Sequence, residues 1–430
     1  MPDNRTLLET LKTDTDLWVN TQAFAEKLFQ DIRKLSRHGA GVTREAYGSV
    51  ETAAIEYLRT AGSKLGLAAR SDAAGNLWLD QPGTDSAAAA VVLGSHADSV
   101  PEGGNYDGLA GIVAGLCVLK ALRDSGVQLA RPVSVLALRG EENSFYGKPY
   151  LGSRALLGLL EPEDIRLVNR DGVTTLAKAM RRCGLIPEKL VTGKPLIDLK
   201  FLACFIELHI EQGPILDMEP EKRTGIVTGI RGLYSHKAIR CERVDCTAPY
   251  DAVVRATTEL LVRMEVLWQS ELNAGRDLVE TTGIISMSEA VEDEALFPIP
   301  HLDFSFDIRS LDHEECLRFH AFLQKEALEV GVKRGVRFVF DPLLESHPAR
   351  MDEELQRVLH KAAAKAGVPV RPIASGAGHD SAYFANAGVP TAMLFVANQK
   401  GSHNPHEDMK MADFMAGVKV LAYAVPQLAG

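Results

Sequence analysis

The stretch Ala88-Ala89-Ala90-Val91-Val92-Leu93-Gly94-Ser95-His96-Ala97-Asp98 decides the fold. Its apolar run over 88–93 predicts a short, fully buried strand. The polar residues begin at Ser95, where the apolar run stops. A buried strand therefore delivers His96 to the edge of a sheet.

Three further apolar runs are followed by polar residues in the same way. Residues 133–138 end before Glu141 and Glu142, residues 201–208 end at His209, and residues 391–396 lead towards His403. Apolar residues at helical spacing over 51–65 and 112–122 predict helices between such runs. This alternation predicts an α/β fold with a parallel or mixed sheet and flanking helices. Because ligands collect at the carboxyl ends of such strands, residues far apart in sequence can share one site.

The chain has 430 residues, which exceeds the size at which a single hydrophobic core stops growing. Between 225 and 340 the order of elements changes to βαββαβ, which is typical of a ferredoxin-like α+β domain. We predict strands at 226–240, 279–286, 302–308 and 335–340, and helices at 250–274 and 312–330. Residues 225–340 are therefore expected to form an inserted domain, with 1–224 and 341–430 forming the main domain.

Composition excludes several classes of protein. The formal net charge of -10 disfavours nucleic acid as a partner, because phosphate binding needs a basic face. No apolar run approaches the roughly 20 residues of a membrane-spanning helix, and the first 34 residues resemble an amphipathic helix rather than an export signal. The six cysteines form no CxxC pair, so buried free thiols are expected. A cytoplasmic location without membrane attachment is the expectation.

Two clusters of polar residues suggest metal chemistry. His96, Asp98 and Asp107 place an imidazole and two carboxylates around one strand end, a ligand set that suits zinc, manganese or cobalt. Alone, this pattern is a weak indication of metal binding, because it is more often a capping aspartate beside a hydrogen-bonded histidine at a strand end. Glu141 and Glu142 are adjacent carboxylates after a buried strand, which is costly unless cations compensate. One of them can bind a metal while the other exchanges a proton with water, although two solvated glutamates would explain the pair as well.

His209 and His403 complete the candidates. Alternation at the end of the strand places Glu207, His209 and Glu211 on one face. His403 lies in a turn-rich segment after the last apolar run. Each histidine alone is more often structural, but five candidates beside strand ends are poorly explained by structural roles.

The chain resembles the hydantoinase/carbamoylase family of metal-dependent amidohydrolases, which includes N-carbamoyl-L-amino-acid hydrolases, beta-ureidopropionases and allantoate amidohydrolases. The family has a metallopeptidase-like catalytic domain and an inserted lid domain. The resemblance covers nearly the whole catalytic domain. It rests on Gly41-Val42-Thr43-Arg44-Glu45-Ala46-Tyr47, Asp72-Ala73-Ala74-Gly75-Asn76-Leu77, Gly94-Ser95-His96-Ala97-Asp98-Ser99-Val100, Asn105-Tyr106-Asp107-Gly108, Arg139-Gly140-Glu141-Glu142, Gly152-Ser153-Arg154-Ala155, His209-Ile210-Glu211-Gln212-Gly213-Pro214, Ser375-Gly376-Ala377-Gly378-His379-Asp380 and Ser402-His403-Asn404-Pro405-His406-Glu407.

The resemblance implies two divalent metal ions, zinc or manganese, with cobalt and nickel as alternatives. It implies that one ion is held by His96 and His209, that the other is held by Glu142 and His403, and that Asp107 bridges them. Glu141 would be the general base, and Asp98 would orient His96 from behind. The substrate would be a small amide or ureido compound bearing a carboxylate, contacted by Gln212, His379 and Arg309. Family members are typically homodimers through the inserted domain.

Two segments depart from the family pattern. The family's His-Ala-Gly-x-x-Pro-Met segment, whose His stabilises the oxyanion, reads Arg243-Val244-Asp245-Cys246-Thr247-Ala248-Pro249-Tyr250 here, with Val244 or Asp245 in the place of the His. The family's substrate-binding Asn is missing near Leu296. His236 is a candidate replacement for the His, although its strand position favours a structural role. Because polar partners are lost, we expect poor rates with simple N-carbamoyl-L-amino acids and better rates with a bulkier or less polar amide.

Three functions are compatible with these observations. A carbamoylase or allantoate-type amidohydrolase is favoured by the motifs. An N-acyl amino acid amidase or dipeptidase would use the same metals on an acyl amide. A noncatalytic metal-binding homologue would explain the lost lid residues but not the retained Glu141, because a binding protein needs no proton shuttle.

Overall fold

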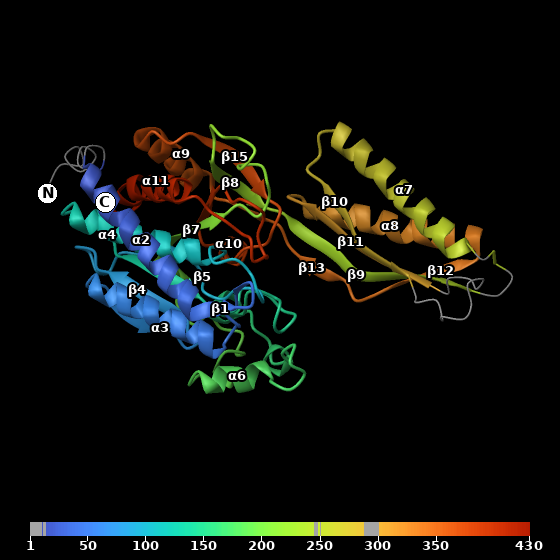
Figure 1. Ribbon diagram of the computed structural model, residues 1–430, viewed down its shortest axis with the longest axis horizontal. Helices are drawn as coiled ribbons and strands as arrows, with labels where there is room; N and C mark the ends of the chain where they lie inside the picture. Colours follow the sequence, from blue (N-terminus) through green and yellow to red (C-terminus); the bar gives the residue numbers. More distant parts are fainter. Residues whose placement is uncertain (1–10, 12–13, 245–247, 250, 288–300) are drawn as a thin grey trace. The chain divides into compact units, whose positions relative to one another are not determined.

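The computed structural model describes residues 11, 14–244, 248–249, 251–287 and 301–430 (Figure 1). The chain divides into two compact units. The first consists of Met1–Thr228 and Arg350–Gly430, and the second consists of Gly229–Ala349. The second unit is therefore an insertion in the sequence of the first.

A nine-stranded mixed sheet runs through the first unit in the order β14-β8-β16-β7-β5-β6-β4-β3, with β15 paired to β8. Its central strands β16, β7, β5 and β6 are parallel neighbours, whereas β8, β4 and β3 pair in antiparallel fashion. The predicted α/β fold with a mixed sheet is confirmed. The strands are β3 (Ala68–Ser71), β4 (Leu77–Gln81), β5 (Ala90–His96), β6 (Val133–Leu138), β7 (Leu202–Ile210), β8 (Thr224–Ile230), β14 (Ala349–Arg350), β15 (Val370–Ser375) and β16 (Thr391–Val396); β1 (Arg37–His38) and β2 (Gly41–Val42) form a separate pair.

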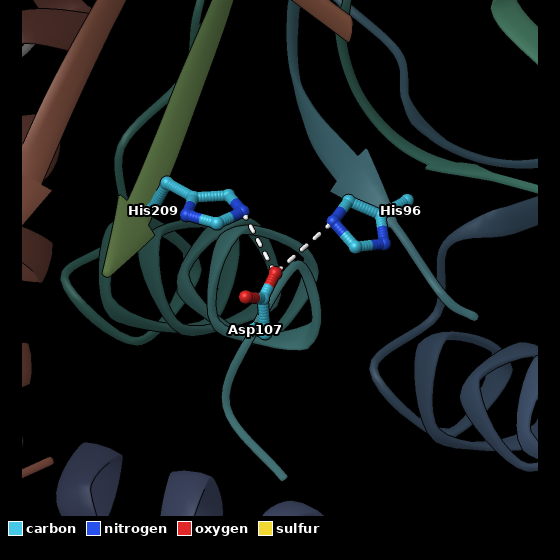
Figure 2. A group of neighbouring side chains, drawn as sticks. All are labelled: His96, Asp107 and His209. Carbon is cyan, nitrogen blue, oxygen red and sulfur yellow. Dashed lines mark ion pairs between the residues drawn. The ribbon is translucent and has the colours of Figure 1, made fainter. Parts of the chain in front are cut away.

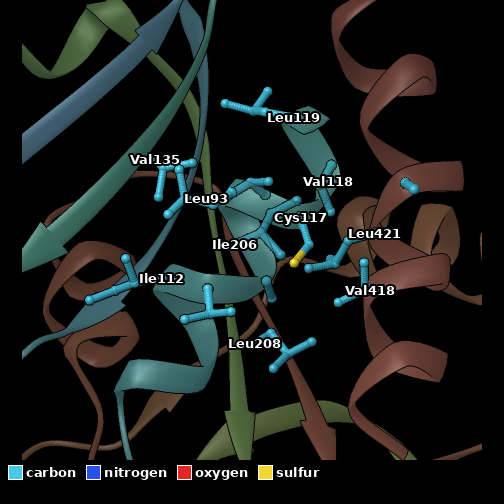
Figure 3. Packing of buried hydrophobic residues seen from close by; sticks show 14 of the residues in the cluster. Leu93, Ile112, Cys117, Val118, Leu119, Val135, Ile206, Leu208, Val418 and Leu421 are labelled. Carbon is cyan, nitrogen blue, oxygen red and sulfur yellow. The ribbon is translucent and has the colours of Figure 1, made fainter. Parts of the chain in front are cut away.

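Helices cover both faces of this sheet because its strands are apolar on both sides. Val91 and Leu93 of β5 pack into a large core with α2, α3, α4, α9 and α11, while Val92 packs on the other face with residues of α5 and α10. Figure 3 shows α4 between the strands and α11, with Cys117 facing Val418 and Leu421. The helices are α2 (Thr15–Ser36), α3 (Ser49–Lys64), α4 (Leu109–Asp124), α5 (Leu151–Leu156), α6 (Leu176–Arg182), α9 (Glu353–Ala366), α10 (Asp380–Asn386) and α11 (Met411–Ala429), with 3-10 turns at Asp164–Arg166, Pro187–Lys189 and Leu199–Phe201.

The parallel strands end level with one another. His96 at the end of β5 is the register partner of Leu138 at the end of β6, and Phe395 of β16 is the partner of His209 in β7. The polar residues that follow these strands therefore meet at one edge of the sheet.

The second unit has the predicted ferredoxin-like arrangement. Its antiparallel sheet has the order β10-β11-β9-β12, and both of its helices pack into one apolar core against this sheet. A short extra strand, β13, pairs with β9 beyond the predicted end of the inserted domain at 340. The elements are β9 (Gly232–Arg243), α7 (Ala252–Asn273), β10 (Val279–Met287), β11 (His301–Ser310), α8 (His313–Arg334), β12 (Val336–Phe340) and β13 (Leu344–Ser346).

The single strand predicted at 226–240 is wrong. The chain forms β8 in the first sheet, breaks at Arg231 and continues as β9 in the second sheet. Arg231 pairs with Asp277 at 3.0 Å, and a Cβ on Gly232 would lie 2.7 Å from Pro348. Strand-forming residues on both sides of Arg231 cannot reveal that the chain leaves one sheet and enters another.

The thiols of Cys117, Cys204, Cys241 and Cys316 are buried and that of Cys183 is half-buried, and all of these cysteines are free. Cys246 lies outside the described residues. Across the part of the chain that the structure describes, no helix combines the length and apolar character needed to cross a membrane.

Candidate metal centre

Asp107 lies between two buried imidazoles at the carboxyl edge of the first sheet (Figure 2). Its Oδ1 is 3.4 Å from Nε2 of His96 and 3.3 Å from Nε2 of His209. Asp107 comes from the loop before α4, and the histidines come from β5 and β7. The ligand atoms of these three residues all lie within 4.8 Å of one another, which makes them the first candidate metal group.

The other oxygen of Asp107 faces a second candidate group. Its Oδ2 is 3.4 Å from Nε2 of His403, and Oε1 of Glu142 is 3.2 Å from the same nitrogen. Asp107, Glu142 and His403 again offer ligand atoms within 4.8 Å of one another. Since each carboxylate oxygen of Asp107 faces a different group, the geometry fits two neighbouring ions that share Asp107.

The arrangement of hydrogen bonds supports this assignment. Within the described chain, Asp107 Oδ1 and Glu142 Oε1 are buried and lack hydrogen-bond partners, although imidazole nitrogens lie 3.2 to 3.4 Å from them. Buried polar atoms are nearly always paired, so unpaired carboxylate oxygens facing imidazole nitrogens fit an absent cation. The residues present therefore suit a pair of divalent transition metals.

A third group, Glu207, His209 and His379, overlaps the first. Glu207 is already satisfied, because Ser95 donates to Oε1 at 2.7 Å and Ser381 donates its backbone N–H and its hydroxyl to Oε2. The Nδ1 of His209 lies 2.9 Å from the carbonyl oxygen of Ile210, which leaves Nε2 to face Asp107. This third group needs no metal to be stable.

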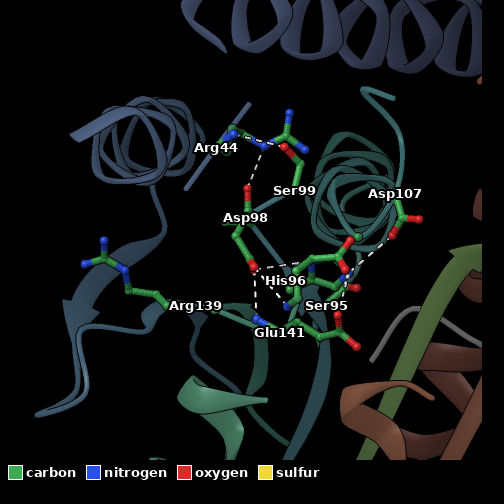
Figure 4. A network of polar contacts seen from close by, with 12 residues as sticks. Arg44, Ser95, His96, Asp98, Ser99, Asp107, Arg139 and Glu141 are labelled. Carbon is green, nitrogen blue, oxygen red and sulfur yellow. Dashed lines mark hydrogen bonds and ion pairs between the residues drawn. The ribbon is translucent and has the colours of Figure 1, made fainter. Parts of the chain in front are cut away.

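Asp98 connects His96 to the two glutamates (Figure 4). Its Oδ1 lies 3.4 Å from Nδ1 of His96, on the side of the ring away from Asp107. Its carboxylate also accepts the backbone N–H groups of Glu141 at 2.9 Å and of Glu142 at 3.0 Å. One buried side chain therefore holds one imidazole and the backbone of both glutamates.

Sequence reasoning assigned no role to Glu407, which holds the loop carrying Asp107. Glu407 is buried and its Oε1 accepts the backbone N–H groups of Tyr106 at 2.8 Å and Asp107 at 3.3 Å. Its place in Ser402-His403-Asn404-Pro405-His406-Glu407, one of the segments that carry the family resemblance, was the only available signal. Gly108 is required in the same loop, because it has φ +66 and a Cβ there would lie 2.4 Å from the His96 ring.

The carboxylates of the site favour the binding of cations. Burial opposes protonation of His403, but the nearby carboxylates of Asp107 and Glu142 raise its pKa to about 11. Burial opposes ionisation of Asp107, yet His209 and the other imidazoles hold its pKa well below the usual value. His403 also has φ +58, a left-handed conformation that is uncommon for histidine and recurs at functional sites. Because metal ions and protons compete for the same lone pairs, such a site favours cations.

Glu141 lies beside both groups without belonging to either. It is buried, and its Oε2 is 3.9 Å from Nε2 of His96. Burial raises the pKa of Glu141 well above its usual value; His96 opposes the shift, whereas Glu142, Asp380 and Asp98 increase it. A glutamate with a raised pKa is suited to accept and return a proton near neutrality.

The structure brings two of the three predicted substrate residues to this site. Gln212 donates from Nε2 to Asp107 Oδ2 at 2.8 Å. The ring of buried His379 packs 4.5 Å from that of His209, and its Nε2 is 3.0 Å from the hydroxyl of Ser375. Arg309 belongs to β11 of the second unit, where its Nε is 3.1 Å from Oδ1 of Asp307.

The segments that depart from the family pattern are described only in part. Val244 is exposed after β9, whereas Asp245 and the segment around Leu296 lie outside the described residues. His236 is buried in the second unit, with Nδ1 2.9 Å from Asp341 Oδ1 and Nε2 2.9 Å from Nε2 of His320. Both ring nitrogens of His236 therefore have partners inside this unit. These contacts favour a structural role for His236, as its strand position suggested, over a role in catalysis.

Comparison with known proteins agrees with the fold and identifies the family. Residues 92–427 match peptidase family M20/M25/M40, to which the chain therefore belongs. It is 34% identical over 416 residues to the N-carbamoyl-L-amino-acid amidohydrolase of Paenarthrobacter aurescens, covering 93% of this chain and 97% of that protein. It is 30% identical to the allantoate amidohydrolase of Bacillus subtilis, covering 93% and 96%. The crystal structure of a hydantoinase/carbamoylase family amidase from Burkholderia multivorans superposes with a TM-score of 0.81 at 27% identity, covering 94% of this chain and 98% of that one. Within the family, the protein is thus an amidohydrolase of the hydantoinase/carbamoylase group, a hydrolase of carbon–nitrogen bonds other than peptide bonds.

Proposed function

We propose that the protein hydrolyses a linear amide or ureido bond in a small carboxylate-bearing substrate, such as an N-carbamoyl amino acid or an allantoate-like compound. The observation that carries this proposal is that Asp107 is shared between two groups of metal-binding side chains, with Glu141 beside them. The names of the relatives support a ureido substrate, because both N-carbamoyl-L-amino acids and allantoate carry this group.

The residues of the site divide into two sets of ligands. One ion would be held by His96 and His209, and the other would be held by Glu142 and His403. Asp107 would bind both ions. Zinc or manganese fits this set of nitrogen and oxygen ligands, with cobalt and nickel as alternatives. Ions bound in this way polarise a carbonyl group and lower the pKa of water towards about 7.

Glu141 would move the proton. Its carboxylate takes a proton from the attacking water and returns it to the leaving nitrogen, which would otherwise depart as a strongly basic anion. Asp98 keeps Glu141 and Glu142 in place through their backbone N–H groups, so that one glutamate binds metal while its neighbour remains free. His379 and Gln212 lie against the ligands His209 and Asp107 and would contact the substrate.

Whereas the dipeptidase considered from sequence does not fit a hydrolase of bonds other than peptide bonds, an N-acyl amino acid amidase remains the alternative function. The match to peptidase family M20/M25/M40 and the changed residues at Val244 support it. The loss of polar lid residues favours a less polar acyl group over the ureido group, since buried polar groups without partners are disfavoured. The noncatalytic binding protein considered from sequence does not fit, because the relatives are amidohydrolases and a binding protein would not need Glu141.

The other properties proposed for the protein follow from its sequence and family. We propose a homodimer formed through the second unit, a cytoplasmic location, and no nucleic acid partner, given the net charge of -10. The second unit would also serve as a lid.

Removal of metal is expected to abolish hydrolysis, and addition of zinc, manganese or cobalt is expected to restore it, because the buried carboxylates cannot activate water without a cation. The measurement is a hydrolysis screen over N-carbamoyl amino acids, allantoate, ureidoglycolate and N-acyl amino acids, with chelated and reloaded protein. Full activity in metal-free protein would refute the mechanism. If simple N-carbamoyl-L-amino acids prove the best substrates, the changed residues of the second unit do not disfavour ureido substrates. The metal-dependent mechanism would be unaffected by that result.

Arg309→Ala is expected to weaken the binding of a carboxylate-bearing substrate by roughly 1.5 to 3 kcal/mol, the worth of a charge-assisted contact. The measurement is KM, with kcat determined in parallel. Arg240→Ala is a matched control, because Arg240 belongs to the same sheet and pairs with Asp303 at 2.8 Å in a similar way. An equal rise of KM in both variants, or none in Arg309→Ala, would mean that the substrate carboxylate binds elsewhere.

A further inference from the structure

The second unit contains a cluster of metal-binding side chains that the hydrolytic function does not use. His313, Glu345 and His347 offer ligand atoms that all lie within 4.8 Å of one another. Apart from the groups around Asp107 and His209, it is the one such cluster in the described residues. It depends on no residue of the first unit.

The backbone places these three side chains together. His313 is the first residue of α8, whose N-terminus is fixed by Asp312, which accepts the backbone N–H of Glu314 at 3.0 Å. Glu345 lies in β13 and His347 follows it by two residues, a spacing that puts both side chains on one face of an extended segment. Two elements far apart in sequence therefore present one ligand group.

The orientation of the side chains also fits a metal. The rings of His313 and His347 lie 4.5 Å apart, and Nε2 of His347 is 3.9 Å from Oε1 of Glu345. The hydroxyl of Tyr234, a buried residue of β9, donates to the same Oε1 at 2.9 Å. Hydrogen bonds of this kind hold carboxylate ligands in place at metal sites.

Only small movements would complete the coordination. Ligand atoms around a tetrahedral zinc ion lie about 3.3 Å apart, given zinc–nitrogen bonds of about 2.0 to 2.1 Å. The side chain of His347 is 67% exposed and that of Glu345 is 39% exposed, so both can rotate without repacking a core. Two imidazoles and a carboxylate suit zinc, cobalt or nickel, with water filling the remaining position.

The three residues lie where the chain leaves the second unit, so a bound ion would hold that part of the chain in place. His347 belongs to the two-residue connection between β13 of the second sheet and β14 of the first. The other connection enters β9 at Gly232, where an added Cβ would lie 2.8 Å from the carbonyl oxygen of Ser346. The two connecting segments therefore run side by side. An ion at His347 would fasten the connection between β13 and β14 to the start of α8.

We propose that His313, Glu345 and His347 form a third transition-metal site, separate from the hydrolytic centre, that fixes the chain where it leaves the second unit.

The test is a zinc titration of the full metal-free chain, read by elemental analysis after gel filtration. Asp107→Ala is used as the background, because it disables the hydrolytic centre whether or not that centre catalyses the proposed reaction. We expect this variant to bind about one zinc per chain, and to lose it when either His347→Ala or His313→Ala is added. Zinc should also raise its unfolding temperature, but not that of the double variants.

His360→Ala is the matched control, since His360 is an exposed histidine of α9 outside every candidate group. It should leave the bound zinc unchanged. The proposal is overturned if Asp107→Ala binds no zinc, if adding His347→Ala leaves the amount unchanged, or if His360→Ala lowers it equally.

Discussion

Glu141→Gln is expected to lower kcat by about a hundredfold or more while leaving the metal content unchanged. Glutamine has the size of glutamate but cannot accept a proton from water. Glu141 belongs to neither candidate metal group, so its replacement removes the proton shuttle and no ligand. The measurements are kcat on the best substrate of the screen and metal content by elemental analysis.

The adjacent residue provides the control. Glu142→Gln changes a residue of the second metal group and should lower metal content together with activity, because Glu142 Oε1 faces Nε2 of His403. The two substitutions have the same chemistry at neighbouring positions held by the same Asp98 carboxylate. If Glu141→Gln lost metal and Glu142→Gln kept it, the two roles would have to be exchanged.

Sequence patterning predicted the parts of the site that depend on strand ends. His96 follows an apolar run and ends β5, and Glu141 and Glu142 follow the run that forms β6. Because parallel strands end level at one edge, convergence of these residues could be inferred without coordinates. The proposed division of ligands between two ions came from family resemblance alone. It is consistent with the two oxygens of Asp107, which face different groups of side chains.

The pattern of apolar and polar residues along the chain did not predict the contacts that loops make. Glu407 supports the Asp107 loop across 300 residues of sequence, and Asp98 bonds to the backbone of both glutamates. Neither contact leaves a periodic signal, because it depends on how loops fold back on one another. The group of His313, Glu345 and His347 escaped notice for the same reason.

The strand break at Arg231 illustrates a different limit. Both segments contain residues suited to strands, Ile226, Val227 and Ile230 before the break and Leu233 and Tyr234 after it, so local propensity predicts one continuous strand. The break is imposed by tertiary structure, since β8 pairs with β16 and β9 pairs with β11. For His236, sequence offered two roles, and its contacts with Asp341 and His320 inside the second unit favour the structural one.

Asp107→Ala is expected to have the largest effect, because Asp107 is the one residue common to both metal groups of the hydrolytic centre within the described chain. Its loss removes a ligand from each ion and leaves His96, His209 and His403 facing an empty space. Metal-ion catalysis contributes several kcal/mol, so activity should fall by at least about a thousandfold. Metal content is measured in a His347→Ala background, so that the second unit does not contribute, and should fall from about two equivalents to nearly none.

A control must distinguish the loss of bound metal in Asp107→Ala from a general loss of folding stability. Asp352→Ala is a suitable control, because Asp352 caps α9 by accepting the backbone N–H of Leu355 at 2.9 Å, and its loss should cost about 1 kcal/mol of stability. This control should keep both metals and its activity at temperatures where it is folded. Retention of one full equivalent when Asp107→Ala is combined with His347→Ala would mean that one group of the hydrolytic centre binds its ion without Asp107. The carboxylate would then not bridge, and the centre would have to act through a single ion.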